Sequence, residues 1–420
     1  MKQAPLNSKT AAIVTVGDEL MTGLVTDTNA AAIARFLLRR GWRIVEKSSV
    51  GDAVPAIAAA VRAAMRRADI VVVTGGLGPT HDDLTKGALC RLFKCGVKFD
   101  AAVLRQVESF FKRMGKPMPG INRDYANIPT AAVAVRNTMG AAPGLFFQKR
   151  VLALPGVPHE TLYMLEHEAP KLIRHGGAYI AEKTFHTAGM GEVALMEKMK
   201  ELHEARQLAD IAFLPGYGRV DIRLLARGKT SAAAQARLKK AAALLYPAIK
   251  PHVWGVDDET IESAVGRLLR KRKKTLAVAE SCTGGGIGKK ITAVPGSSDY
   301  FSGGIISYAN GVKEKTLGVP AAILKKHGAV SRECAEAMAE GARTGLKTDY
   351  ALAVTGVAGP GGGTKEKPVG LVYVAAAAEG WVQVRRLNLA GSRETIRERA
   401  ANEALFFLRE ILSARSNNRG

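Results

Sequence analysis

The chain has 420 residues, of which 47% are hydrophobic and 24% charged. This length exceeds what one hydrophobic core serves, and the composition excludes a globally disordered chain, so two or three folded domains are expected. With 61 Lys and Arg residues against 38 Asp and Glu residues, the net charge of +23 favours anionic partners, either phosphorylated small molecules or nucleic acid.

The distribution of apolar residues and cysteines indicates a cellular compartment. No segment has the apolar length of a secretion signal or of a membrane span. Four cysteines in so long a chain make no disulfide framework, and the pair Cys90 and Cys95 lacks metal-binding CxxC spacing. We therefore expect a cytoplasmic protein in a reducing environment, without membrane association.

The first block, residues 1–175, alternates short β-branched apolar runs with longer runs rich in Ala and Leu. Alternating strands and helices predict a parallel sheet covered on both faces, with ligands at the carboxyl ends of the strands. The predicted elements are strands at 11–17, 42–51 and 69–76, with helices at 29–41 and 54–68.

The second block, residues 176–255, predicts a small α+β domain with strands at 183–189, 211–216 and 219–228 and helices at 192–206 and 231–249. It lacks the GxxG clamp with which KH modules hold RNA, so a connecting or dimerisation role is expected.

The third block, residues 256–420, predicts a further α/β domain. Its expected strands lie at 275–281, 303–309, 350–356 and 369–378, between a helix at 261–272 and an amphipathic helix at the end. The basic run 267–274 ends the first of these helices, where cations suit the helix dipole, so it predicts a solvated face; the alternative is a patch for nucleic acid.

A reactive serine is expected in this block, in the run AESCTGGG at 279–286, between a strand and a helix. The free N–H groups of a first helical turn suit a phosphate or an oxyanion. Ser281 is the candidate nucleophile, and the alternative is the neighbouring thiol of Cys282. The alternative without a catalytic role is that Ser281 caps the helix.

A serine needs a base, and no histidine lies nearby. Lys313, in the run YANGVK at 308–313, could act as base if partial burial lowers its pKa, with Tyr308 relaying the proton. The alternative without a catalytic role is that Lys313 is an exposed surface charge. A second glycine-rich loop at 355–364 would let backbone approach a ligand, and Arg393 and Arg397 suit the grip of a phosphate.

These motifs resemble the CinA family (competence/damage-inducible protein A), as do GSSDYFSGG, AVTGVAGPGGGTKEKPVG and GSRETIRERA in the third block. The resemblance implies a nicotinamide-nucleotide amidase without a cofactor, which converts nicotinamide mononucleotide and water to nicotinate mononucleotide and ammonia. It makes Ser281 the nucleophile and Tyr308 and Lys313 its activating partners. The implied substrate-binding residues are Thr283, Gly284, Gly285, Asn310, Thr355, Gly356, Gly359 and Arg393.

The first block carries VTVGDELMTGLVTDTNA, VTGGLGPTHDDLTKGA and LPGVPHE, which resemble the N-terminal domain of the same family and, more distantly, molybdopterin-binding folds. The resemblance implies an ADP-ribose pyrophosphatase that uses a divalent metal, Mg, Mn or Co. Carboxylates are hard oxygen ligands, and His81 could bind cobalt. The expected metal ligands are Asp18, Asp82 and Asp83, and the rest of the expected site is Gly75, Gly76, Gly78, Thr80 and Glu19. The alternative without a metal is that these carboxylates are helix N-caps.

Two positions depart from the usual family pattern. Val193 stands where a Gly-Glu-Ser run often has serine, and Asn122–Tyr125 replaces a more usual basic run. If these positions hold the dinucleotide, the pyrophosphatase is weakened.

Two other function classes compete with the enzyme. A DNA-associated accessory protein would use the charge of +23, and a molybdopterin-handling protein would rest on the fold of the first block alone. A homodimer is expected from the resemblance and from the apolar helices of the second block.

Overall fold

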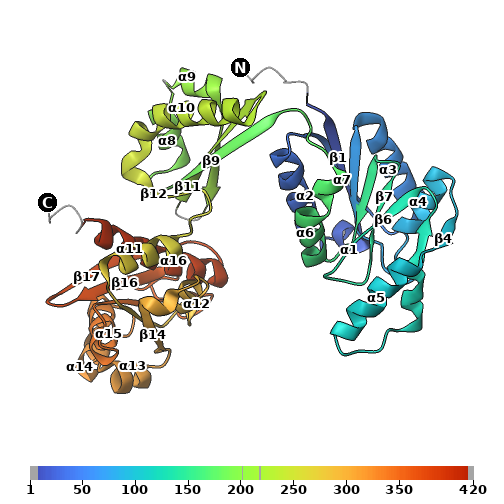
Figure 1. Ribbon diagram of the computed structural model, residues 1–420. Helices are drawn as coiled ribbons and strands as arrows, with labels where there is room; N and C mark the ends of the chain where they lie inside the picture. Colours follow the sequence, from blue (N-terminus) through green and yellow to red (C-terminus); the bar gives the residue numbers. More distant parts are fainter. Residues whose placement is uncertain (1–7, 201, 217–218, 415–420) are drawn as a thin grey trace. The chain divides into compact units, whose positions relative to one another are not determined.

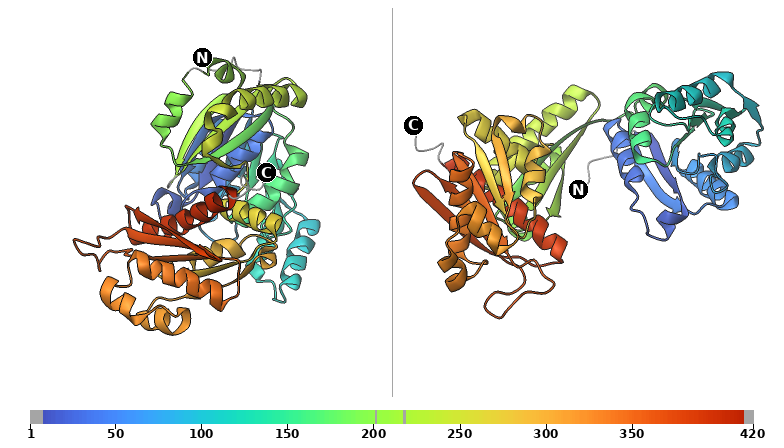
Figure 2. Two further views of the ribbon diagram at one scale, coloured as in Figure 1. Left: turned by 90° about the vertical axis from the view of Figure 1, so that its left-hand side faces the viewer. Right: turned by 90° about the horizontal axis from the view of Figure 1, so that it is seen from below.

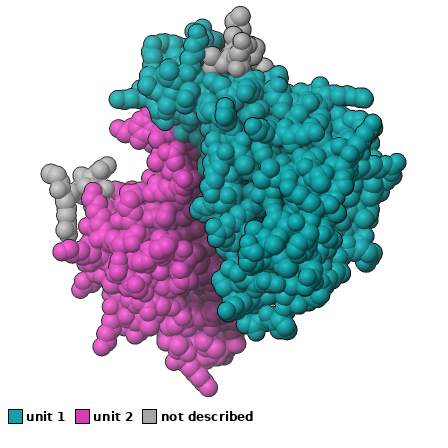
Figure 3. All heavy atoms as spheres, turned by 45° about the vertical axis from the view of Figure 1, so that its right-hand side comes forward, with its two compact units in different colours: residues 1–182, 203–210, 224–244 teal, residues 183–202, 211–223, 245–420 magenta. Residues whose placement is uncertain are grey.

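The computed structural model describes residues 8–200, 202–216 and 219–414. The chain forms two compact units, coloured separately in Figure 3. Unit 1 comprises residues 1–182, 203–210 and 224–244, and unit 2 comprises residues 183–202, 211–223 and 245–420. The division passes through the predicted middle block, and the boundaries expected at 175 and 255 stay predictions.

Unit 1 contains a six-stranded sheet in the order β2-β1-β3-β8-β7-β6. The first four strands are parallel, while β7 and β6 run antiparallel to their neighbours. The predicted parallel sheet is thus confirmed for the three predicted strands, β1, β2 and β3, and β8 joins them as a fourth parallel strand that was not predicted. The strands β7 and β6 follow short connections, which antiparallel neighbours allow. The strands are β1 (Thr10–Val16), β2 (Arg43–Val50), β3 (Ile70–Thr74), β6 (Ala132–Val135), β7 (Gly144–Phe147) and β8 (Val151–Leu154).

Helices cover both faces of this sheet (Figure 1), which explains why β1 and β3 are buried almost throughout. One face packs against α2 (Thr28–Arg39), α6 (Pro158–His167) and α7 (Ala169–Leu172). The other packs against α3 (Val54–Arg67), α4 (Thr85–Phe93) and α5 (Ala101–Arg113). The remaining elements are α1 (Asp18–Met21), the 3-10 helix η1 (Gly120–Ala126) and the ribbon of β4 (Val97–Phe99) and β5 (Asn127–Pro129).

The middle block forms a four-stranded sheet in the order β10-β11-β9-β12. The helix predicted at 192–206 is two helices, because the first ends at Lys198 and a turn from Leu202 N–H to Met199 O follows it. The elements are β9 (Tyr179–Ala188), α8 (Glu192–Lys198), α9 (His203–Leu208), β10 (Asp210–Gly216), β11 (Arg219–Gly228), α10 (Ser231–Ile249), η2 (Lys250–His252) and β12 (Val253–Val256).

The C-terminal part of unit 2 is a five-stranded sheet in the order β14-β13-β15-β16-β17. Its first three strands are parallel, and β16 and β17 are antiparallel. The predicted strands are confirmed, and β17 was missed. The strands are β13 (Leu276–Glu280), β14 (Phe301–Ile306), β15 (Tyr350–Gly356), β16 (Leu371–Ala378) and β17 (Trp381–Asn388).

This sheet also lies between two layers of helices (Figure 2). The larger core includes α11 (Ile261–Arg272), α12 (Gly286–Thr292) and the terminal α16 (Arg393–Ala414). The second core packs α13 (Asn310–Leu317), α14 (Ala321–His327) and α15 (Arg332–Gly345) against the opposite face. A short 3-10 helix, η3 (Ser297–Asp299), precedes β14. The carboxyl ends of β13 and β14 therefore lie beside α12 and α13, where the expected serine and lysine are.

The basic run 267–274 is engaged with its own domain at three cations. Arg267 forms an ion pair with Glu259 at 2.7 Å, and Lys274 with Asp349 at 2.6 Å. The guanidinium of Arg270 lies 5.7 Å from the ring centre of Tyr300. Fewer cations of the run 267–274 are therefore available to a partner than the sequence indicates.

Close approach of α15 to the end of α13 depends on a glycine. A Cβ at Gly341 would overlap the carbonyl oxygen of Leu317, the last residue of α13, whereas a Cβ at Gly345 of the same helix α15 would meet no atom within 4 Å. We expect Gly341→Ala to lower the free energy of unfolding by about 1–3 kcal/mol through overpacking, and Gly345→Ala to leave it nearly unchanged. Urea denaturation of both variants checks this, and equal midpoints would refute it.

A charged histidine anchors β9 to β12 within unit 2. The Nδ1 of His186 lies 2.8 Å from Asp221 Oδ1, and its Nε2 lies 2.7 Å from the carbonyl oxygen of Asp257. Both partners only accept, so the imidazole must carry both protons. Burial alone would lower the pKa of His186, but these hydrogen bonds raise it overall. Its ring stacks on Trp254 at 4.9 Å, which meets Phe406 of α16 edge-on at 5.4 Å.

This anchor predicts a pH-dependent stability. Because the folded pKa of His186 is raised, its contribution is complete below the unfolded pKa and is lost as pH rises through the folded value. Between pH 6 and pH 9 the wild type should lose more unfolding free energy than His186→Gln, in which residue 186 does not titrate. Urea midpoints at both pH values measure this; identical pH dependence in the two proteins would contradict it.

Candidate active site

Ser281 and Lys313 meet in a buried contact, as the sequence predicts. Ser281 follows β13, and its N–H donates to Val354 O of the neighbouring β15 at 2.9 Å. Lys313 lies on α13, next to the end of β14, and its Nζ is 3.1 Å from Ser281 Oγ. Ser281 is 9% exposed and Lys313 is 1% exposed. The alternative interpretation of Lys313 as an exposed surface charge is therefore wrong.

The surroundings of Lys313 favour its neutral amine. Burial lowers the pKa of Lys313. Its Nζ also lies 2.6 Å from Ser307 O and 3.3 Å from Tyr308 O, and no ion pair with a carboxylate is found for it in the described part of the chain. A neutral amine has two N–H groups for the two carbonyls and one lone pair. The lone pair then faces the hydroxyl of Ser281, which is the geometry of a general base.

The turn that carries Ser281 is closed by a carboxylate of the chain itself. Glu280, which is 1% exposed, accepts hydrogen bonds from the N–H groups of Gly285, Ile287 and Gly288 at 2.9–3.1 Å. The expectation that these first-turn N–H groups would hold a substrate phosphate or oxyanion is wrong, because Glu280 already occupies them. Glu280 was not predicted as a site residue, although it stands directly before Ser281 in the sequence.

Glu280 should therefore be needed for the shape of the turn. Glu280→Gln keeps the volume but places an NH₂ group against backbone donors, so we expect a loss of about 1–3 kcal/mol in unfolding free energy. Glu314→Gln, at an exposed position of α13, is the control and should change it by less than about 0.5 kcal/mol. Thermal and urea unfolding measure both. Equal stability of the two variants would show that the three hydrogen bonds do not hold the turn.

Tyr308 does not lie between Ser281 and Lys313, as a proton relay would require. Its side chain is 62% exposed, and its hydroxyl accepts a hydrogen bond from Arg393 at 2.9 Å. Arg393 also donates to Gly359 O at 2.6 Å. The direct contact between Ser281 and Lys313 leaves no place for a relay by the Tyr308 hydroxyl. Tyr308 and Arg393 instead form one exposed polar pair beside the second glycine-rich loop.

Arg397 holds the serine turn in place rather than projecting freely toward a phosphate. Its Nε donates to Cys282 O at 3.1 Å, and its second guanidinium nitrogen donates to Thr283 O at 3.0 Å. The thiol of Cys282 is buried, and burial raises its pKa to about 11. A thiol at neutral pH is a weak nucleophile, so the geometry disfavours the Cys282 alternative.

The other expected substrate residues lie around the same strand ends. Gly284 and Gly285 take left-handed conformations with φ of 59° and 92°, which the tight turn requires. The buried hydroxyl of Thr283 has no hydrogen-bond partner within the described chain, while that of Thr355 donates to Ala329 O at 2.7 Å. Asn310 begins α13 and is exposed, and Gly356 ends β15.

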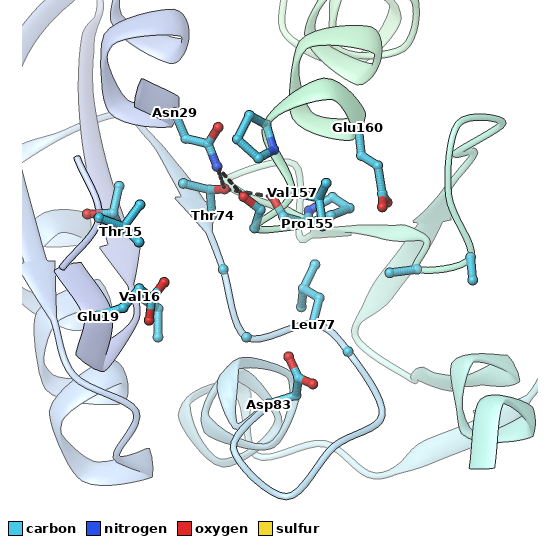
Figure 4. A pocket seen from close by; sticks show the side chains of 18 of the residues that line it. Thr15, Val16, Glu19, Asn29, Thr74, Leu77, Asp83, Pro155, Val157 and Glu160 are labelled. Carbon is cyan, nitrogen blue, oxygen red and sulfur yellow. Dashed lines mark hydrogen bonds between the residues drawn. The ribbon is translucent and has the colours of Figure 1, made fainter. Parts of the chain in front are cut away.

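Unit 1 has a cavity of about 690 Å³ at the carboxyl ends of β1, β3 and β8 (Figure 4). It brings together part of the expected N-terminal site, namely Glu19, Gly75, Gly76, Gly78 and Asp83. Asp18, Thr80 and Asp82 are not among the described residues that line it. The position agrees with the rule that ligands bind at the carboxyl ends of parallel strands.

The expected metal ligands are not assembled. Asp18 Oδ1 accepts from Asp52 N at 3.0 Å, and Asp82 accepts from the hydroxyl of Thr80 at 2.5 Å, a bond that lowers the pKa of Asp82. Asp83 accepts from the same threonine. Over residues 8–200, 202–216 and 219–414, no group of three or more His, Cys, Asp or Glu side chains is arranged to hold a metal ion. The set Asp18, Asp82 and Asp83 does not fit a divalent metal in this structure.

Two acidic side chains of the cavity have raised pKa values. Burial raises the pKa of Glu160, whose carboxylate accepts from Asn137 at 2.6 Å. Burial, with the nearby charges of Asp83 and Glu160, also raises the pKa of Tyr125. Glu160, Asn122 and Tyr125 line the cavity and were not among the expected site residues.

Helices long and apolar enough to cross a membrane are not found among the described residues.

Three family models match consecutive parts of the chain. Residues 12–175 match a probable molybdopterin binding domain, residues 182–255 the KH domain of damage-inducible protein CinA, and residues 258–412 the CinA C-terminal domain. The middle domain is thus KH-like, a fold that the sequence analysis did not assign because GxxG is missing.

Relatives match along almost the whole length. A CinA-like protein of Gemmatimonas aurantiaca is 43% identical over 96% of both chains. A putative competence-damage inducible protein of Halothermothrix orenii is 37% identical over 96% of this chain and 98% of its own. Among solved structures, protein CinA of Thermoplasma acidophilum is 33% identical and covers 40% of this chain and 99% of its own, with a TM-score of 0.37. On these full-length matches, the chain belongs to the CinA family.

Proposed function

We propose that the C-terminal domain is a nicotinamide-nucleotide amidase, which hydrolyses nicotinamide mononucleotide to nicotinate mononucleotide and ammonia. The observation that carries the proposal is the buried 3.1 Å contact between Ser281 Oγ and Lys313 Nζ. A hydroxyl beside an amine whose pKa burial lowers is an activated nucleophile, and it needs no metal. Family membership supports the substrate class.

The mechanism follows from this contact. Lys313 accepts the proton of Ser281 as Oγ attacks the carboxamide carbon, and the tetrahedral intermediate collapses when the Lys313 ammonium protonates the leaving nitrogen. Ammonia departs and leaves an ester on Ser281. Water, deprotonated by the same amine, attacks this ester, and the acid product leaves while Ser281 regains its proton. The carbonyls of Ser307 and Tyr308 hold the amine in position throughout.

The phosphate of the substrate is assigned to Arg393. Its guanidinium has five N–H groups, and two of its nitrogens make the bonds to Gly359 O and the Tyr308 hydroxyl, so further donors remain for an anion. Tyr308 then orients Arg393, a role different from the expected proton relay.

The amidase predicts a specific pattern of variants. Ser281→Ala and Lys313→Ala should lower ammonia release from nicotinamide mononucleotide by about 10³-fold or more, because they remove the nucleophile and the base. Ser302→Ala and Lys315→Ala, at exposed positions of β14 and α13, are matched controls and should keep full activity. Release in each protein is measured with and without EDTA.

The results of this assay decide the proposal. EDTA-resistant release that only the two site variants abolish supports it. No release from folded wild-type protein, or full activity in Ser281→Ala, would refute a serine amidase. Full activity in Cys282→Ala is also required.

The pH profile tests Lys313 separately. The base must be neutral, so the rate at saturating substrate should fall as pH falls through the lowered pKa of Lys313. The midpoint of this fall in rate should lie below pH 10.5, the ordinary pKa of a lysine side chain. It is measured as kcat against pH, and a rate that falls only through pH 10.5 or above would contradict the role.

Other expected activities stay predictions. ADP-ribose hydrolysis with added Mg, Mn or Co tests the N-terminal domain, for which we derive no metal-dependent step. DNA binding with a steep salt dependence would favour the accessory-protein alternative. A homodimer and a cytoplasmic location also stay predictions.

A further inference from the structure

Two cysteines meet at the C-terminal end of α4 in unit 1. The helix ends at Phe93, and Lys94 follows in the left-handed conformation, with φ of 50° and ψ of 47°. The N–H of Cys95 donates to Cys90 O at 3.0 Å. The N–H of Lys94 donates to Arg91 O at 3.4 Å. These two hydrogen bonds define a Schellman helix ending, which commonly brings the side chains of its first and sixth residues into contact. Those residues are Cys90 and Cys95.

The two thiols lie close enough for one to affect the ionisation of the other. Burial raises the pKa of Cys90 to about 11, and the charge of Cys95 and a hydrogen bond with its side chain act in the same direction. Neighbouring thiols do not both ionise readily, so a thiolate in this pair faces a protonated partner. A thiolate beside a thiol is the arrangement from which a disulfide closes.

The backbone holds both cysteines in this arrangement. Cys90 lies in the last two turns of α4, and the carbonyl oxygen of Gly96, the residue after Cys95, accepts from Thr130 N at 2.9 Å. Cys95 also packs against the hydrophobic core of unit 1, as does Phe93. A disulfide can form only where the two backbone positions are already close. The hydrogen bond from Cys95 N–H to Cys90 O meets this condition before oxidation.

Reagents in solution can reach this pair more easily than the other thiols. The chain has four cysteines, and the structure describes all four as free. Cys90 and Cys95 are partly exposed, whereas Cys282 and Cys334 are buried. In a reducing compartment the pair is expected to stay as thiols, so a change of state requires an oxidant.

We propose that Cys90 and Cys95 form a reversible disulfide on exposure to a low-molecular-weight disulfide, the oxidised form of a small cellular thiol. The Cys95 thiolate attacks one sulfur of the oxidant, and the small thiolate that leaves takes up the proton that Cys95 gave up. The thiol of Cys90 then loses its proton and attacks the Cys95 sulfur, and the second small thiol leaves with that proton. The protein loses two hydrogen atoms, and the oxidant is reduced to two thiols. This modification site does not depend on the proposed amidase.

Counting thiols by alkylation tests the proposal. The reduced full chain is incubated with glutathione disulfide, freed of the reagent, and treated with iodoacetamide without denaturant before its mass is measured. We expect labels on Cys90 and Cys95 in the reduced protein, no label on either after oxidation, and full recovery of both after dithiothreitol. Closure should be about tenfold or more faster at pH 9 than at pH 7, because Cys90 must lose its proton.

Single variants separate closure of the disulfide from other oxidation. Cys90→Ser removes the thiol that acts second, so the mixed disulfide with glutathione should accumulate at Cys95. Cys95→Ser removes the thiol that acts first, and the reaction of Cys90 with the reagent should be about tenfold or more slower. Cys282→Ala removes a buried thiol and is the matched control, which should close the disulfide as the wild type does. Cys90→Ala serves if Cys90→Ser unfolds.

Peptide mapping without reductant decides the outcome. A cross-link between Cys90 and Cys95 within one chain supports the proposal. Three results would overturn it: both labels retained after oxidation, glutathione left on the wild type as the end product, or a disulfide between two chains. None of these measurements uses ammonia release, so the amidase is judged independently.

Discussion

The amine of Lys313, buried between two carbonyls and a serine hydroxyl, sets the demands on the rest of its domain. Its position requires the end of β14 to present the carbonyls of Ser307 and Tyr308. It also requires α13 to lie close against α15, which Gly341 allows. A lysine that is 1% exposed would destabilise the fold if its charge had to be kept. Burial lowers the pKa of Lys313, which favours the neutral amine that the proposed general base needs.

A buried carboxylate of the chain itself satisfies the backbone donors of the turn that carries Ser281. A turn at a strand-to-helix junction leaves N–H groups free, and Glu280 fills them from inside while Arg397 holds the carbonyls of Cys282 and Thr283. Ser281, the proposed nucleophile, is therefore held in place by the chain itself, and such positioning lowers the entropic cost of a reaction. In the proposed amidase the substrate phosphate is assigned to Arg393, because Glu280 already uses three N–H groups of the turn.

The sequence was sufficient for the elements whose pattern is repetitive and for side chains that meet one another. Strand and helix alternation predicted β1, β2 and β3 of the first sheet and all but β17 of the C-terminal sheet, and the motifs placed Ser281 and Lys313 together; β6, β7 and β8 were not predicted. It missed β17, whose residues are mostly polar or half-buried because it lies at a sheet edge. Glu280 and Arg397 were missed or given another role because their partners are backbone atoms, which leave no pattern in side chains. The metal set stays a prediction, because Asp18 accepts a hydrogen bond from Asp52 N and Asp82 accepts one from Thr80 in this structure.

The net charge of +23 does not show which part of the protein binds a ligand. Cations of the basic run 267–274 are engaged by Glu259, Asp349 and the ring of Tyr300. The cavity of unit 1 has no described basic residue in its lining, although the chain is strongly basic. A ligand is recognised by the few groups that face it in a desolvated space, where each charge acts over a short distance with little screening. The residues that face a cavity therefore say more about its ligand than the net charge of the protein.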